Sequence, residues 1–172
     1  REKGEKEEAE YNTIAAGKAA VRTPVVANGD IDSPQKAARV LAATGADALM
    51  IGRAAMGRPW LFREIGHFLQ TGAELPSPAV AEVRNALLRH LNDHYRLYGE
   101  YTGVRNARKH INWYVASLPG GSLLRQRVNT MESATEQTQA VDAFFAGLQE
   151  AHARLPHPCA TPSQEQALLL AA

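Results

Sequence analysis

The chain has 172 residues, with 19 Lys and Arg against 18 Asp and Glu, and its 45% apolar and 22% charged residues are typical of a folded globular protein rather than a disordered one. A single cysteine excludes an internal disulfide framework, and no apolar run approaches the ~20 residues of a membrane span. We therefore expect a cytoplasmic protein without membrane contact. Because the sequence lacks an initiator Met, we also expect it either to begin inside a larger protein or to be an expression fragment.

The first part of the chain alternates between helix and strand signals. Residues 12–21 are expected to form a helix, and residues 23–27 a short buried strand that stops at Asn28-Gly29-Asp30. Ser33 and Pro34 are typical of a helix start, and Gly45 of a helix end. Residues 46–51 predict a second buried strand, followed by a short helix at 54–56 and a longer one from Pro59 to Leu69. This order indicates a parallel βαβ unit with a right-handed crossover.

The pattern changes after Gly72, where the strand signals stop. Pro78 begins a helix that runs to Tyr98 and ends at Gly99, and a second helix covers residues 104–118. A short segment at 123–128 precedes a last helix, which the capping box Ser133-Ala134-Thr135-Glu136 begins and which ends before Pro156. One buried stripe is expected to contain Val80, Val83, Leu87, Leu91 and Tyr98. We therefore predict an α/β domain over residues 1–72, a small all-α bundle over 73–155 and a disordered tail over 156–172.

The two predicted strands end in residues suited to a phosphate. Asn28, Gly29 and Asp30 follow the first strand, and Gly52 and Arg53 follow the second. In parallel α/β proteins such ends share one edge of the sheet, where ligands bind. Glycine permits close approach to the backbone, and Arg53 adds a cation. The alternative is that both glycines only make tight turns, and spacing does not separate the two.

The positive charge of the chain is concentrated in its middle. Residues 76–127 carry eight basic and three acidic residues, whereas residues 128–172 carry one and five. On the helix over 104–118, Arg105, Arg108 and Asn112 share one side, and Lys109 and Trp113 lie beside them. Cations bind RNA phosphates and an aromatic ring can stack on an unpaired base. The alternative is a solvated basic face with Trp113 as a core anchor, opposite an apolar side of Val104, Ala107, Ile111 and Val115.

The histidines and the cysteine give weaker signals. His110 lies among cations, which predicts a low pKa; it could hold RNA or fill a polar niche in the bundle. His90 and His94 share a helix face, but no third ligand is apparent, so we predict no metal site. Cys159 is expected to be an incidental exposed thiol.

Several segments closely resemble the bacterial tRNA-dihydrouridine synthases, and among them the B subfamily. The resemblance runs collinearly from Arg1 to Leu148. It is carried by Thr23–Ile31, Thr44–Ala55, Gly57–Trp60, and Gly103–His110 with Trp113-Tyr114.

The resemblance implies the C-terminal part of an FMN-binding TIM barrel followed by a helical tRNA-binding domain. Such enzymes use NADPH to reduce FMN, which passes hydride to a uridine in tRNA while a cysteine donates a proton. By position, the resemblance assigns FMN contacts to Asn28, Gly29, Asp30, Gly52 and Arg53. It also favours RNA binding by the basic face of the helix over 104–118, where the candidate RNA-binding residues are Arg105, Arg108, Lys109, His110 and Trp113.

A complete barrel takes about 250 residues, and only residues 1–72 are barrel-like. Cys159 lies beyond the matched region, so we expect the catalytic cysteine to lie upstream and this chain alone to be inactive. Open barrel edges predict self-association. Two alternatives stay open: a non-catalytic RNA-binding fragment, and another FMN-barrel oxidoreductase.

Overall fold

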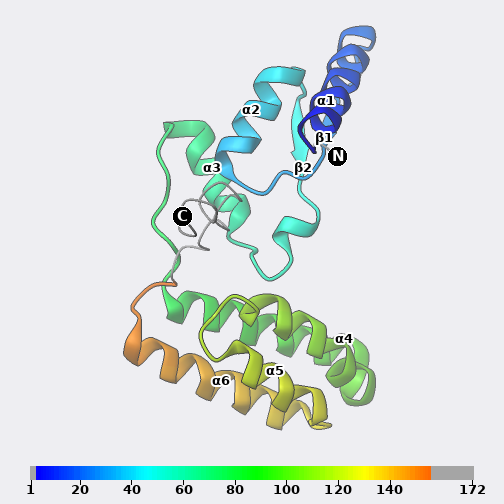
Figure 1. The fold of residues 1–172 in the computed structure, drawn as a ribbon. Coiled ribbons are helices and arrows are strands. Elements are labelled where there is room, and N and C mark those ends of the chain that lie inside the picture. The colour runs from blue at the N-terminus through cyan, green and yellow to red at the C-terminus, as the bar shows by residue number, and fades with distance from the viewer. Residues whose placement is uncertain (1–2, 156–172) are drawn as a thin grey trace, which may run out of the picture. The chain divides into compact units, whose positions relative to one another are not determined.

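The computed structural model describes residues 3–155, with side chains from Tyr11 onward (Figure 1). The predicted tail at 156–172 and Cys159 lie outside these residues. The chain divides into two compact units, and the boundary along the sequence falls between Pro76 and Ser77. Among residues 3–155, no helix combines the length and the apolar character needed to cross a membrane.

The first unit contains the predicted parallel βαβ arrangement. Its elements are α1 (Lys3–Ala20), β1 (Val26–Asn28), α2 (Pro34–Thr44), β2 (Ala48–Met50), the 3₁₀ turn η1 (Arg53–Ala55) and α3 (Leu61–Thr71). β1 and β2 pair in parallel, with Ala27 opposite Leu49. Ser33 caps α2 through its side chain, and Gly45 ends it in the left-handed conformation (φ 63°), both as predicted.

Several predicted boundaries in this unit are wrong, among them those of β2, which covers Ala48–Met50 rather than residues 46–51, and of η1, which covers Arg53–Ala55 rather than 54–56. α1 begins at Lys3 rather than Asn12, because Glu, Lys and Ala dominate the preceding residues and favour helix. β1 begins at Val26 rather than Thr23, because the N–H of Val25 donates to the side chain of Asp47 instead of to a neighbouring strand. α3 begins at Leu61 rather than Pro59, because the chain turns between Ala55 and Leu61 through two backbone hydrogen bonds that Arg58 makes.

The core of the first unit lies on one face of the two strands. Ala27 is fully buried there among residues of α2, α3 and the loops, and α2 packs against both α1 and α3 (Figure 1). On the opposite face, Val26 and Met50 are each 54% exposed. Since parallel sheets normally bury both faces, this sheet is covered on one side only. The members of the core are Ala27, Ile31, Ala37, Val40, Leu61 and Ile65.

The second unit is all helical apart from one isolated bridge among its described residues. It contains α4 (Val80–Val115), α5 (Gly121–Thr130) and α6 (Ala134–Ala151), and α4 packs against both of the others. The bridge joins Ala79 to Arg154, so the segment after α6 pairs with the segment before α4. Ser133 caps α6 by accepting from the N–H of Glu136, as predicted.

Gly99 divides α4 into two halves that fold back on each other. Its φ of 72° and ψ of 173° are not helical. His90 and His110 would be about 30 Å apart on a straight helix, yet their ring centroids lie 4.9 Å apart. The predicted break at Gly99 is therefore confirmed, but the second half begins directly after it rather than at Val104.

The predicted apolar stripes are buried with one exception. Tyr98 is 50% exposed, because it is the last residue before the chain reverses at Gly99. The segment predicted at 123–128 forms the middle of α5, which is longer at both ends. The confirmed stripe residues are Val80, Val83, Leu87, Leu91, Val104, Ala107, Ile111 and Val115.

Candidate functional site

The ends of β1 and β2 lie side by side, since Asn28 pairs with Met50 in the parallel ladder. The residues predicted to contact a cofactor therefore share one edge of the sheet. Arg53 donates a hydrogen bond from Nη2 to Oδ1 of Asp30, which joins the two strand ends. The side chains of Arg53 and Asp30 are 82% and 62% exposed, so the pair faces solvent.

The backbone after β1 adopts an unusual conformation. Gly29 has a φ of 154° and Asp30 a φ of 40°. Both values are positive, and residues other than glycine rarely adopt a positive φ. Tyr11 of α1 donates a 2.6 Å hydrogen bond from its hydroxyl to the carbonyl of Gly29. A Cβ added at Gly29 would lie 3.3 Å from the Tyr11 ring, so a small residue is favoured there. Sequence reasoning missed Tyr11, because only the fold brings α1 to this turn.

Arg58 fixes the loop after β2. Its guanidinium donates to the carbonyl of Asp32 at 3.2 Å and to Oε2 of Glu64 at 2.6 Å. The loops after the two strands are therefore tied together twice, through Arg53 with Asp30 and through Arg58 with Asp32. Sequence reasoning missed the role of Arg58, although its proximity to Pro59 and Glu64 was a local signal.

The strand-end residues fit a phosphate group. Arg53 offers an exposed guanidinium, which suits phosphate in shape and charge. A Cβ added at Gly52 would meet no atom within 4 Å, so the backbone there is open to approach. The carboxylate of Asp30 already pairs with Arg53, so a bound phosphate would share this cation with Asp30.

The predicted basic face of α4 has two kinds of residue. The guanidinium of Arg105 lies 3.8 Å from the centre of the Tyr101 ring and donates to Glu132 at 2.9 Å. Lys109 is exposed, and its Nζ lies 5.8 Å from the Trp113 ring. Arg105 and Lys109 thus present cations at the surface.

Arg108 points into the helical unit instead. Its Nη2 donates to the carbonyl of Met131 at 2.9 Å, and its Nε is buried with no hydrogen-bond partner among the described residues. This arginine therefore links α4 to the segment that joins α5 and α6.

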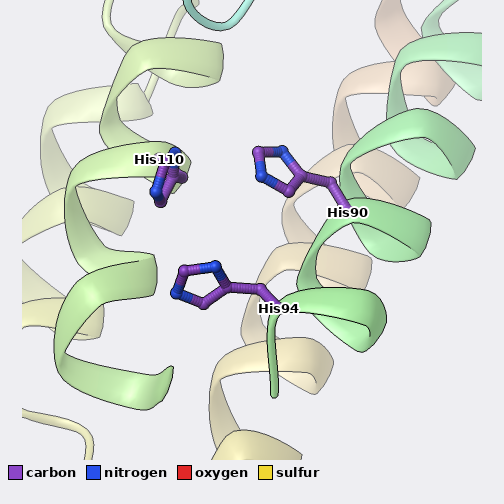
Figure 2. A group of neighbouring side chains, drawn as sticks. All are labelled: His90, His94 and His110. Atoms are coloured by element: carbon purple, nitrogen blue, oxygen red, sulfur yellow. The ribbon is translucent and has the colours of Figure 1, made fainter. Parts of the chain in front are cut away.

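His110 lies between the two halves of α4, where its ring faces those of His90 and His94 (Figure 2). Its ring centroid is also 4.9 Å from that of Trp113, which is half-buried. Burial, reinforced by nearby His90, His94 and Lys109, lowers the pKa of His110 to about 4. The predicted direction is confirmed, but burial contributes more than neighbouring charge.

The prediction that His90 and His94 lack a third ligand is wrong. One ring nitrogen from each of His90, His94 and His110 lies within 4.8 Å of the other two. The error has a clear physical reason: the third histidine comes from the other half of α4, and only the reversal at Gly99 brings it close.

A buried polar residue that sequence reasoning missed holds the helical unit together. Gln137 is completely buried and donates from Nε2 to the carbonyls of Val104 and Val128, each at 3.2 Å. Its Oε1 accepts from the hydroxyl of Tyr95 at 2.9 Å. Gln137 of α6 thereby connects the two halves of α4 to each other and to α5. These bonds fix the half of α4 that carries Arg105 and Lys109.

The chain is similar to known proteins of one family over most of its length. Residues 1–149 match the dihydrouridine synthase (Dus) family. A protein named tRNA-dihydrouridine synthase B from Pseudomonas aeruginosa is 55% identical over 139 residues, which are 81% of this chain and 42% of that protein. Its namesake from Vibrio cholerae is 51% identical over 140 residues, 81% of this chain and 44% of that protein. The chain thus spans less than half the length of these relatives.

Proposed function

Because the chain belongs to the dihydrouridine synthase family, we propose that it serves in the FMN-dependent reduction of uridine to 5,6-dihydrouridine in tRNA, with NADPH as the reductant. In this proposal the first unit supplies the corner that holds the flavin phosphate, and the second unit supplies the tRNA-binding surface. The observation that carries the proposal is the pairing of Arg53 with Asp30 at adjacent strand ends, in a chain that matches the family along residues 1–149.

The strand-end residues of the first unit divide the binding of the cofactor between them. Gly52 and Arg53 hold the phosphate, because an open backbone and an exposed guanidinium suit an anion. Asn28, Gly29 and Asp30 contact the cofactor from the neighbouring strand, and Tyr11 positions them through Gly29. Bound FMN would supply the hydride chemistry, and the protein would supply its binding and orientation.

The second unit holds tRNA through the surface cations of α4. Lys109 and Arg105 contact phosphates, since both present charge at the surface. His110 and Trp113 lie against each other beside Lys109, so their part is to support this surface from within. Arg108 supports it too, through its bond to Met131.

The chain by itself is not expected to complete the reaction. Residues 3–155 contain no cysteine to act as the proton donor that the resemblance implies. The sheet of the first unit has two strands, whereas a barrel closes on eight. The exposed face of Val26 and Met50 supports this interpretation, because it is the face opposite the helices, and in a closed barrel that face is packed in the interior.

A titration of the full chain with FMN, followed by flavin fluorescence, tests the cofactor corner. We expect weak binding that Arg53→Ala weakens further and that Arg39→Ala, an exposed arginine on α2, leaves unchanged. Equal affinity of the Arg53→Ala variant and the unaltered chain for FMN would contradict the proposal that Arg53 binds the flavin phosphate. Tight binding of one FMN per chain would contradict the expectation that the chain alone cannot complete the cofactor site.

A second candidate function is RNA binding without catalysis. It is favoured by the helical unit, which has its own buried core and its own surface cations. The other alternative from the sequence, a different FMN-barrel oxidoreductase, is not favoured, because the family match extends through the helical unit to residue 149. Flavin binding that depends on Arg53 separates the first candidate from the second.

A further inference from the structure

Three histidines meet inside the helical unit, in the space between the two halves of α4 (Figure 2). His90 and His94 lie one turn apart on the first half, so their side chains project from the same face. His110 projects toward them from the second half. The ring centroid of His110 is 4.9 Å from that of His90 and 5.1 Å from that of His94.

The rings meet edge to face rather than in a stack. The planes of His90 and His94 are 83° apart, and the plane of His110 is 62° from each of them. In this arrangement ring nitrogens can converge on one point, and one nitrogen from each histidine lies within 4.8 Å of the other two. Ligand nitrogens around a tetrahedral zinc ion are about 3.3 Å apart, because each lies ~2.0–2.1 Å from the metal. Modest rotations of the side chains would close the remaining gap.

The ring of His94 also has a buried nitrogen without a partner. Nε2 of His94 is buried and has no hydrogen bond to any described residue. Buried polar atoms are normally satisfied, and leaving one unsatisfied costs free energy. Aromatic packing explains why the rings touch, but it gives this nitrogen no partner. A metal ion would provide one.

From this geometry we infer that His90, His94 and His110 form a binding site for a divalent transition metal ion, with zinc as the favoured occupant. The ligand chemistry selects this class of ion. Imidazole nitrogens suit zinc, nickel, copper and iron, whereas magnesium and calcium require oxygen ligands. The cluster contains no carboxylate among its members in the described part of the chain. Three protein ligands leave a fourth position for water.

Such an ion would connect the two halves of α4 by coordination. The ring centroid of His94 lies 4.7 Å from that of Tyr98, which is four residues further along the helix, and the ring of His110 contacts Trp113. The metal would therefore fix the helix turn that carries Lys109. This inference does not depend on the proposed reaction, because it rests on the residues between the halves of α4 alone.

Metal titration of the full chain tests the site. The purified chain is stripped with a chelator, dialysed and titrated with Zn²⁺ by calorimetry, and Co²⁺ serves as a visible probe of four-coordinate geometry. We expect saturable binding of one ion per chain and the d–d absorption of tetrahedral Co²⁺. Removing even a residue behind the metal ligands weakens affinity by about 10–100-fold, so His94→Gln, His90→Gln and His110→Gln should each weaken Zn²⁺ binding at least ~tenfold.

Two variants serve as matched controls. His152→Gln changes an exposed histidine outside the cluster, and Cys159→Ser removes the single thiol. Both should bind Zn²⁺ like the unaltered chain, and circular dichroism checks that each variant is helical. If one histidine variant fails to fold, the other two carry the test. The inference is overturned if the chain binds no Zn²⁺ saturably, if the cluster variants keep full affinity, or if Cys159→Ser abolishes binding.

Discussion

The hydroxyl of Tyr95 donates a 2.9 Å hydrogen bond to Oε1 of Gln137, a glutamine with no exposed surface. Burial raises the pKa of Tyr95 to about 12, so the phenol keeps its proton at neutral pH and remains a donor. Because Gln137 also donates to the carbonyls of Val104 and Val128, this pair connects α4, α5 and α6.

Tyr95→Phe removes this donor and leaves Oε1 of Gln137 buried without it. We expect a loss of about 1–3 kcal/mol in the free energy of unfolding, the usual cost of an unsatisfied buried polar group. Urea unfolding followed by circular dichroism measures it. Tyr101→Phe is the matched control, because Tyr101 is 72% exposed and should lose little. Equal losses in the two variants would contradict the role given to Gln137.

A methyl group added at the start of α5 should be poorly tolerated. A Cβ at Gly121 would lie 1.9 Å from the carbonyl oxygen of Val115, a backbone atom that cannot move aside cheaply. Gly121→Ala should therefore destabilise the helical unit by at least ~1–3 kcal/mol. Gly147→Ala lies within α6, where the added methyl group meets nothing within 4 Å, and it should stabilise by up to ~1 kcal/mol. Thermal unfolding compares them, and a Gly121→Ala variant that is at least as stable as the unaltered chain would contradict this clash.

The stability of the first unit should fall in acid through Asp47. Its carboxylate accepts from Lys18 at 2.6 Å and from the N–H of Val25 at 2.7 Å, and these bonds lower the pKa of Asp47. The unfolded chain binds the proton at higher pH than the folded one, so the contribution is complete above about pH 4. It is lost as pH falls below that value. Thermal unfolding of Asp47→Asn between pH 6 and pH 3 should therefore depend less on pH than that of the unaltered chain, and identical profiles would rule out this role.

Glu132 should weaken RNA binding, because it neutralises Arg105 through a 2.9 Å ion pair. We expect Glu132→Gln to strengthen tRNA binding and Lys109→Ala to weaken it while reducing the salt slope by about 1. Arg105→Ala should weaken binding in the same direction. Fluorescence anisotropy with labelled tRNA at several salt concentrations measures all three, with Arg39→Ala as the control. An unchanged salt slope in Lys109→Ala would contradict the proposed surface.

Self-association should depend on the uncovered face of the sheet. Val26 and Met50 are each 54% exposed on neighbouring strands, and such an apolar surface favours contact with a second copy. Met50→Glu should shift the chain toward monomer in sedimentation. Leu97→Glu alters a residue of α4 that is 74% exposed and should leave the distribution unchanged. A monomeric unaltered chain would contradict this expectation.

Local signals in the sequence predicted much of the fold. Ser33 and Gly45 were predicted to cap the two ends of α2, and Ser133 the start of α6. These predictions are confirmed, because capping depends on residues that are close in the chain. The strand ends were also predicted to meet, since parallel pairing aligns them. The meeting of His110 with His94 could not be predicted in this way, because it depends on how far the chain reverses at Gly99. The burial of Gln137 was missed for a related reason, since its partners lie on two other helices.

The reversal at Gly99 also affects how the helical unit folds. The two halves of α4 are joined by a single non-helical residue, so little chain entropy is lost when they come together. Contacts between them are close in sequence, a property that accompanies fast folding. β1 and β2, in contrast, are separated along the chain by the whole of α2, so their pairing closes a longer loop. During synthesis the βαβ unit would therefore emerge first, and the hairpin of α4, which emerges after it, would close through contacts much nearer in sequence.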